Sequence, residues 1–159
     1  MTKLKYDFEN SIGYWIIITA HALERSLSQE LAPHGITNRQ WQVLAWLALE
    51  GELCQTELAE RMKIEPPTLV RVLDRMEQAG WIRRRDDPAD RRKKLITATD
   101  EAVPTWTRAT TCARQVRERA VNGIEPEEME RLMQAMRSIQ QNLSRPVKAK
   151  KDQANVVCQ

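Results

Sequence analysis

Cysteine and histidine are scarce in this sequence of 159 residues, which has three cysteines and two histidines. Cys54, Cys112 and Cys158 are odd in number and lie far apart, so they form neither a disulfide framework nor the closely spaced pairs of a zinc site. The two histidines also argue against a metal cluster. We therefore expect no bound metal and a reduced protein.

Long hydrophobic runs are missing as well. Trp15–Ile18 is too short to span a bilayer, which needs about 18 apolar residues, and the first residues lack the apolar core of a secretion signal. The sequence also lacks a Ser/His/Asp, Cys/His or phosphate-loop pattern. We expect a cytoplasmic protein with no membrane partner, no enzymatic activity and no cofactor.

The net charge of +3 is small, but its distribution along the chain is uneven. Residues 61–94 carry eleven lysines and arginines against six aspartates and glutamates, whereas the rest of the chain is net negative. Phosphate neutralisation supplies the sequence-independent part of nucleic-acid affinity. The concentration of positive charge therefore predicts a surface that faces a polyanion.

This basic segment lies within residues 53–99, whose pattern predicts two helices and a hairpin. The first helix covers about 55–62, and the second begins at two prolines, where a missing N–H is tolerated, and ends at Gly80. Spacing of i, i+3, i+4 and i+7 predicts a buried stripe of Leu69, Val72, Leu73 and Met76. The opposite face carries Thr68, Arg71 and Arg75, which suits a helix that enters a major groove. The alternative for one such helix is an ordinary solvated face.

The hairpin favours DNA binding over that alternative. Residues 81–85 and 93–97 are predicted strands, and the Asp and Pro residues of the loop 86–92 favour a reversal. Five arginines and two lysines on this ribbon would repel one another, and Asp86, Asp87 and Asp90 can offset part of the repulsion. Such a tip suits a narrow minor groove, whose negative potential attracts arginine.

Further helices are predicted on both sides of this stretch. Upstream, one helix is predicted over about 8–31, and a second begins after its cap, Thr37, and extends to Gly51. Downstream, Thr99 is expected to cap a long helix, and a last helix starts at Glu125. The stripe predicted on the long helix consists of Val103, Trp106, Thr110, Ala113, Val116 and Ala120. The expected fold class is mainly α, a winged helix-turn-helix with a two-stranded β wing and a helical dimerisation region, in the order α-α-α-α-β-β-α-α.

The chain is expected to have four parts. Residues 1–36 would form an N-terminal dimerisation helix, 37–99 a DNA-binding domain, and 100–144 the C-terminal dimerisation helices. Apolar stripes on three helices are more than one small winged domain can bury, which favours a homodimer. Residues 145–159 lose all periodicity and are predicted to be a disordered basic tail.

The sequence resembles the MarR family and, within it, the SlyA-type regulators. The resemblance rests on the order of the helices, on the segment Ile64–Asp74, and on Asp90–Lys94 followed by Thr99–Ala102. The resemblance covers about residues 8–143. It implies a homodimeric transcriptional regulator, a repressor or counter-silencer, that binds pseudo-palindromic promoter sites on double-stranded DNA. In the family, the Asp-x-Arg motif braces the tip of the wing and directs arginine into the minor groove. The expected DNA-binding residues are Lys63, Pro67, Thr68, Arg71, Arg75, Arg84, Arg85, Asp90, Arg91, Arg92 and Lys94.

The resemblance also implies an effector site between the dimerisation helices and the winged domain, where many relatives bind small phenolic carboxylates and release DNA. The expected residues are His21, Arg25, Trp41 and Ala45. Trp41 matches the SlyA-like pattern, but His21 stands where the pattern has arginine, and neutral histidine is a weaker, pH-dependent counter-charge. The alternative role for His21 is packing in a dimer interface, and Arg25 lies one turn further on.

Cysteine oxidation is the alternative mode of regulation on the same scaffold. A redox switch needs an acidic, accessible thiol, typically near a helix N-terminus or a basic group. Cys54 precedes a helix, whereas Cys112 lies in a helix expected to pack in the dimer. The first helix holds no cysteine, although the peroxide-sensing relatives have theirs there.

Overall fold

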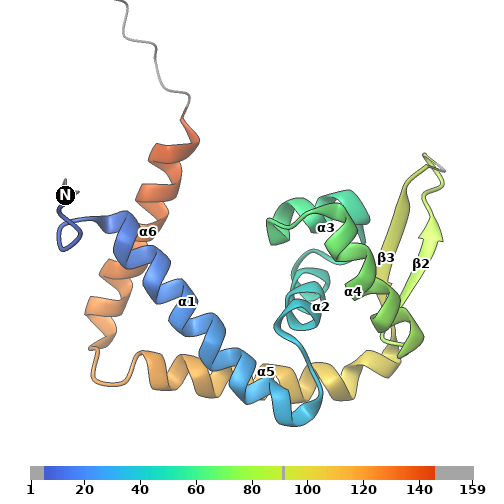
Figure 1. The fold of residues 1–159 in the computed structure, drawn as a ribbon, viewed down its shortest axis with the longest axis horizontal. Coiled ribbons are helices and arrows are strands. Elements are labelled where there is room, and N and C mark those ends of the chain that lie inside the picture. Colours follow the sequence, from blue (N-terminus) through green and yellow to red (C-terminus); the bar gives the residue numbers. More distant parts are fainter. Residues whose placement is uncertain (1–5, 91, 146–159) are drawn as a thin grey trace, which may run out of the picture. The chain divides into compact units, whose positions relative to one another are not determined.

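The helices and strands follow the order expected from the sequence, with one added strand. The computed structural model describes residues 6–90 and 92–145. The elements are α1 (Ile12–Leu31), η1 (Ala32–His34), α2 (Asn38–Glu50), β1 (Leu53–Cys54), α3 (Gln55–Met62), α4 (Pro66–Gln78), β2 (Ile82–Asp86), β3 (Lys94–Ala98), η2 (Asp100–Ala102), α5 (Val103–Ala120) and α6 (Pro126–Ser144) (Figure 1). The predicted fold class, mainly α with a winged helix-turn-helix, is confirmed.

The chain divides into two compact units, residues 1–120 and 121–159. The first unit holds every element from α1 to α5, and the second holds α6. This division by compactness does not test the expected division into dimerisation and DNA-binding parts, which stays a prediction. The predicted tail lies outside the described residues, except for Arg145.

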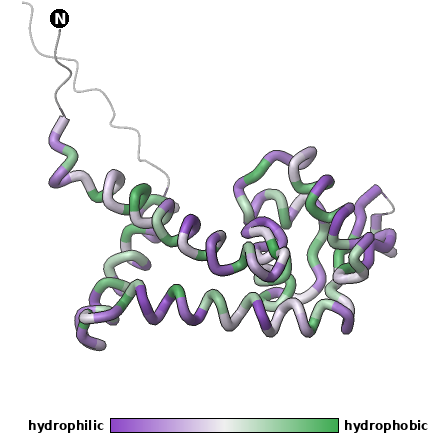
Figure 2. Tube along the Cα trace, turned by 60° about the horizontal axis from the view of Figure 1, so that its bottom comes forward, coloured by the Kyte–Doolittle hydropathy of each residue, from purple (hydrophilic) through white to green (hydrophobic). Residues whose placement is uncertain are grey.

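The main hydrophobic core joins α2, α3, α4 and the sheet. Its fully buried members include Val43, Leu58, Leu69, Leu73, Met76 and Ile96. The stripe predicted on α4 is confirmed at Leu69, Leu73 and Met76, whereas Val72 lies at the edge of this core and is only half-buried. Figure 2 shows hydrophobic and hydrophilic residues alternating along the helices, which is the pattern of elements with one buried face.

The sheet has three antiparallel strands in the order β1-β3-β2, rather than the two predicted. The short strand β1 pairs Leu53 with Ile96 of β3, and β2 pairs Arg84 with the same residue from the other side. Two residues are too few to show an alternating pattern, so sequence reasoning missed β1. The two predicted strands each lie one residue further along the chain than expected.

Hydrogen bonds fix the beginnings of the first two helices. Thr37 caps α2 as predicted: the Gln40 amide donates to the Thr37 hydroxyl at 3.2 Å, and the Thr37 amide donates to Gln40 Oε1 at 2.9 Å. The first helix begins at Ile12 rather than near residue 8, because Ser11 accepts from the Tyr14 amide at 3.3 Å and acts as its cap.

The predicted side-chain cap at Thr99 is wrong. The Thr99 hydroxyl donates instead to the carbonyl of Gly80, and the residues after it form the 3-10 turn η2 before α5 begins at Val103. The Thr99 amide also donates to the carbonyl of Trp81 at 3.0 Å. Thr99 therefore joins the end of the sheet to the end of α4, a role that depends on residues 18 and 19 positions away and leaves no local signal.

The stripe predicted on α5 is confirmed at Val116 and only half-buried at Trp106, Thr110 and Ala113, because the buried face is turned away from it. The buried residues are Thr105, Ala109, Cys112 and Val116, whereas Val103 is 55% exposed. Within this set, Ala109 and Cys112 pack with Leu31 of α1, and Cys112 Sγ donates to the carbonyl of Glu30 at 3.4 Å. Small side chains at this contact allow the two helices to approach closely, and hydrophobicity alone did not reveal that preference.

Two helices keep apolar side chains exposed within the protomer. On α1, Ile12, Trp15 and Ile17 are each more than half exposed. No residue of α6 is buried, and Leu143 is 81% exposed. None of the helices in the described ranges is long and apolar enough to cross a membrane.

Candidate nucleic-acid interface

Helix α4 presents a polar stripe above a fully buried apolar one. It begins at Pro66, with prolines at its first two positions, and ends before Gly80, whose φ of 75° is in the left-handed region. Leu69 and Leu73 are 0% exposed, so the packing fixes the rotation of the helix about its axis. Thr68, Arg71 and Arg75 are exposed on the opposite face, as the sequence predicted, and Pro67 is exposed as well.

The turn between α3 and α4 adds a positive charge beside this stripe. Lys63 ends α3 with a φ of 52°, a left-handed conformation that is uncommon for a residue other than glycine. Its side chain lines a shallow hollow of about 350 Å³ with Thr56, Glu60 and Pro66. Lys63 therefore lies next to the N-terminal end of α4, where a phosphate can approach.

Ion pairs divide the basic residues of this region into two groups. Arg61, Arg84, Arg85, Arg92 and Lys94 each pair with a carboxylate. Within the described residues, Lys63, Arg71, Arg75, Arg83 and Lys93 have no such partner. The positive charge that is free to meet a polyanion thus lies on α4, on the turn before it and, at Arg83 and Lys93, on the hairpin.

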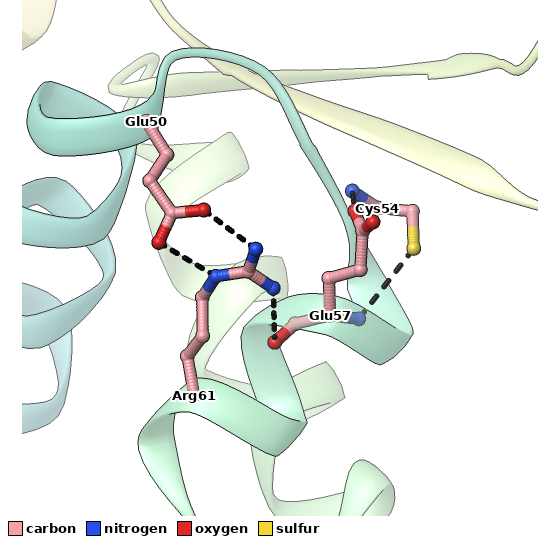
Figure 3. A network of polar contacts seen from close by, with 4 residues as sticks. All are labelled: Glu50, Cys54, Glu57 and Arg61. Carbon is pink, nitrogen blue, oxygen red and sulfur yellow. Dashed lines mark hydrogen bonds and ion pairs between the residues drawn. The ribbon is translucent and has the colours of Figure 1, made fainter. Parts of the chain in front are cut away.

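A polar network holds α3 against the elements before it (Figure 3). The Arg61 guanidinium donates from Nε and Nη2 to the two oxygens of Glu50, at 2.7 and 2.5 Å. The Cys54 amide donates to Glu57 Oε2 at 2.8 Å, and this hydrogen bond lowers the pKa of the Glu57 carboxyl. Cys54 also caps α3, since its sulfur accepts from the Glu57 amide. Serine or threonine is the usual residue here, so sequence reasoning did not identify Cys54 as a cap.

The wing tip is folded around Asp90. Its carboxylate accepts from the Arg92 amide at 3.1 Å and from Arg92 Nε at 3.1 Å, and these two contacts lower its pKa, the side-chain contact most. The Lys93 amide donates to the Asp90 carbonyl at 2.8 Å. The Arg92 side chain is 91% exposed. Arg91 lies outside the described residues.

The other described wing residues expected to bind DNA, Arg84, Arg85 and Lys94, are engaged within the protein. Arg85 makes two hydrogen bonds to Glu52, at 3.0 and 2.6 Å, and Lys94 pairs with Asp86. Arg84 turns toward α4 and pairs with Asp74, and its side chain is only 20% exposed. Arg85 and Lys94 lie at exposed positions of the ribbon, whereas the position of Arg84 suits an internal bridge better than a contact with DNA.

The protomer places the four expected effector residues on two helices. His21 and Arg25 are exposed on α1, whereas Trp41 and Ala45 are half-buried on α2. Trp41 stacks on Trp106 of α5, with ring centroids 5.0 Å apart and planes 14° from parallel. Trp106 also lines a small apolar hollow of about 120 Å³ with Leu44, Leu47 and Val103. Sequence reasoning missed this stacking because the two tryptophans are 65 residues apart.

The two described cysteines are buried. Cys54 is 7% exposed and Cys112 is 3% exposed. Cys158 lies outside the described residues. A redox switch needs a thiol that an oxidant can reach, so the geometry does not favour this mode of regulation, which stays an untested alternative.

The helix–turn–helix of α3 and α4, followed by the hairpin of β2 and β3, defines a winged helix-turn-helix protein. The MarR family matches residues 36–94. A MarR-family transcriptional regulator from Rhodococcus sp. RHA1 is 25% identical, with a TM-score of 0.76 over 85% of this chain and 96% of its own. The structure of transcriptional regulator PA3341 is 32% identical, with a TM-score of 0.76 over 84% of this chain and 98% of its own. Residues 36–94 therefore match the MarR family, and the fold is that of the solved transcriptional regulators.

A curated relative is similar over part of the chain. The uncharacterized HTH-type transcriptional regulator YwoH of Bacillus subtilis is 34% identical over 84 residues. The matching stretch is 53% of this chain and spans 61% of the length of that relative.

Proposed function

We propose that this protein is a transcriptional regulator of the SlyA type that binds a specific site on double-stranded DNA, with α4 in the major groove. The observation that carries the proposal is the exposed stripe of Thr68, Arg71 and Arg75, whose arginines have no ion-pair partner within the described residues. The buried leucines of the same helix hold that stripe outward. Lys63, in the turn before α4, would then lie near the phosphate backbone, and the exposed Arg92 of the wing would lie near the minor groove.

We further propose a homodimer on a pseudo-palindromic promoter site, acting as a repressor or counter-silencer. The uncovered apolar residues of α1 and of α6 support this, because a protomer alone leaves them in water. Two copies of α4 would then lie about 34 Å apart, one turn of the duplex. We propose that the protein works in the cytoplasm as a binding protein, not an enzyme, without a cofactor.

A small aromatic carboxylate is the proposed effector, bound near His21, Arg25, Trp41 and Ala45. The related CouR of Rhodococcus jostii RHA1, which is 26% identical with a TM-score of 0.73, was solved bound to p-coumaroyl-CoA. The stacked Trp41 and Trp106 provide an aromatic surface in this region. Arg25 is exposed and offers the permanent positive charge that a carboxylate needs.

Protection of promoter DNA tests the proposed function. We expect the purified protein to protect a two-fold symmetric site in the DNA flanking its gene and to sediment as a dimer at the concentrations that give protection. A folded monomer at micromolar concentration, or equally tight binding to a lone half-site, would contradict the dimer. Failure to distinguish any promoter fragment from random DNA would contradict the regulator.

Asp90→Ala should weaken DNA binding, by about threefold or more, even though it removes a negative charge. The wing tip would lose the bonds from Arg92 to Asp90 and would have to be ordered on contact with DNA. Because the pKa of Asp90 is lowered, the brace is intact at neutral pH and is lost only as the pH falls through that lowered pKa, below the usual 3.8. The measurement is a titration of labelled operator DNA at physiological salt.

Arg92→Ala is the companion variant, because it removes the positive charge and the side-chain bonds to Asp90 but keeps the bond from the residue 92 amide to Asp90. The slope of log K against log salt should flatten by about 0.9 for each lost phosphate contact, counted per subunit, whereas Asp90→Ala should leave the slope nearly unchanged. Tighter binding by Asp90→Ala would show that Asp90 is only a loop residue whose charge opposes DNA.

A further inference from the structure

Arg84 of the wing is bound to the recognition helix α4 through both its side chain and its backbone. Its Nη1 lies 2.6 Å from Asp74 Oδ1 and 3.4 Å from Glu77 Oε2, and its Nη2 donates to the carbonyl of Val70 at 3.4 Å. These three partners lie on successive turns of α4. The guanidinium therefore lies along the side of the helix.

The backbone of Arg84 is tied to the same helix. Strand β2 is at the edge of the sheet, so every second amide has no partner strand. The Arg84 amide donates to Glu77 Oε1 at 3.0 Å and so finds its partner on α4 instead. The Glu77 carboxylate thus accepts a hydrogen bond from the Arg84 amide and also forms a longer ion pair with the Arg84 guanidinium.

The contact is not an arrangement for maximum stability. Arg84 Nε is buried and has no hydrogen-bond partner among the described residues. A buried N–H without a partner costs free energy, and a partly buried ion pair is weak evidence for stability. Arg84 lies on the inward face of β2, between Ile82 and the tip of the wing. An arginine at this position is explained if it fixes the position of β2 relative to α4.

We propose that Arg84 is a positioning residue that clamps the wing to the recognition helix, so that α4 and the wing meet DNA as one preformed unit. The clamp consists of Arg84, Asp74, Glu77 and the carbonyl of Val70. The inference rests on the proposed DNA binding, but it assigns Arg84 a function through other residues rather than a contact with phosphate.

Asp74→Asn separates these two functions by the sign of its effect. If Arg84 positions the wing, the variant binds operator DNA about five- to tenfold more weakly, because the wing must be ordered on binding. If Arg84 contacts phosphate, losing Asp74 frees its guanidinium and removes a negative charge, so binding becomes tighter. Asp86→Asn is the matched control, since it also removes one carboxylate that pairs with a cation of the wing, here Lys94, but leaves α4 unchanged. This control should bind DNA as tightly as the wild type or more tightly.

Arg84→Met provides a second discrimination. Methionine keeps the apolar stem and removes the unpaired N–H, so the fold and the dimer should persist in circular dichroism and sedimentation. The affinity for DNA should fall as much as in Asp74→Asn. The double variant Asp74→Asn/Arg84→Met should show no further loss, because the two substitutions disrupt the same clamp. The salt slope should remain that of the wild type, whereas loss of a phosphate contact would lower it by about 0.9 per subunit. Additive losses or a lowered slope would overturn the clamp.

Hydrogen exchange of the DNA-free protein tests the clamp without DNA. In Asp74→Asn, the amides of β2 should exchange faster, including that of Arg84, while those of the α1–α5 contact stay protected. Unchanged exchange in β2 would overturn the inference even if DNA binding fell. A wild type that binds no promoter DNA but shows this exchange pattern would contradict the proposed function and leave the clamp supported. If Arg84→Met does not fold, Asp74→Asn still decides, because the Asp74 side chain is 47% exposed.

Discussion

Arg71→Ala should weaken binding to the specific site by about 1–3 kcal/mol and relax the preference for one base pair, because arginine pairs with guanine through two hydrogen bonds. Arg71 is exposed near the middle of α4 and has no ion-pair partner in the described part of the chain. It lies beside Thr68, one turn earlier, and we assign both to base edges and Arg75 to the backbone. The measurement compares the affinity for the operator with that for variants of each of its base pairs.

Lys63→Ala is the matched control for Arg71, since it removes one unpaired charge from the turn before α4. We expect it to weaken all DNA sequences alike and to lower the salt slope by about 0.9 per subunit, as loss of a phosphate contact does. The ratio of specific to random affinity should stay constant. If the two variants lost affinity equally on operator and random DNA, the assignment of Arg71 to base edges would be wrong.

Leu73→Ala should lower the free energy of unfolding by about 2–5 kcal/mol, the range for truncating a leucine in a well-packed core. The Leu73 side chain is 0% exposed and packs with Leu69 and Met76 in the core that joins α2, α3, α4 and the sheet. The packed elements on every side limit how far the cavity can collapse. Denaturant unfolding at one fixed protein concentration measures the change, because dimer formation makes stability depend on concentration.

Leu49→Ala is the control for Leu73→Ala, since it is the same chemical change at a residue that is 74% exposed at the end of α2. A change within about 0.5 kcal/mol is expected there. Equal losses in the two variants would show that the core around Leu73 can collapse onto the smaller side chain.

The recognition helix is the part of the site that local pattern predicts best. Its limits follow from prolines 66 and 67 and from Gly80, and its rotation follows from apolar residues at helical spacing. The brace at Asp90 was also predictable, because the family resemblance assigned it, and its acceptor reaches Arg92 only two residues away. These features depend on residues that are close along the chain.

The orientation of the wing arginines could not be predicted in this way. Arg84 and Arg85 are identical neighbours in the sequence, but one turns toward Asp74 and the other pairs with Glu52, 33 positions away. Which carboxylate each one meets depends on the distance between β2 and α4 and on the position of the loop before β1. That information is absent from the local sequence.

The sequence by itself determined the helices, the hairpin, the basic stripe on α4 and the resemblance to the MarR family, because each follows from periodicity, caps and short motifs within about twenty residues. Only the tertiary structure decided the third strand, the bond from Thr99 to Gly80, the face of α5 that meets α1, and the stacking of Trp41 on Trp106. It also decided which positive charges remain free. The physical reason is the same in each case: a partner far along the chain satisfies a hydrogen bond, a charge or an apolar surface, and packing alone brings the two together.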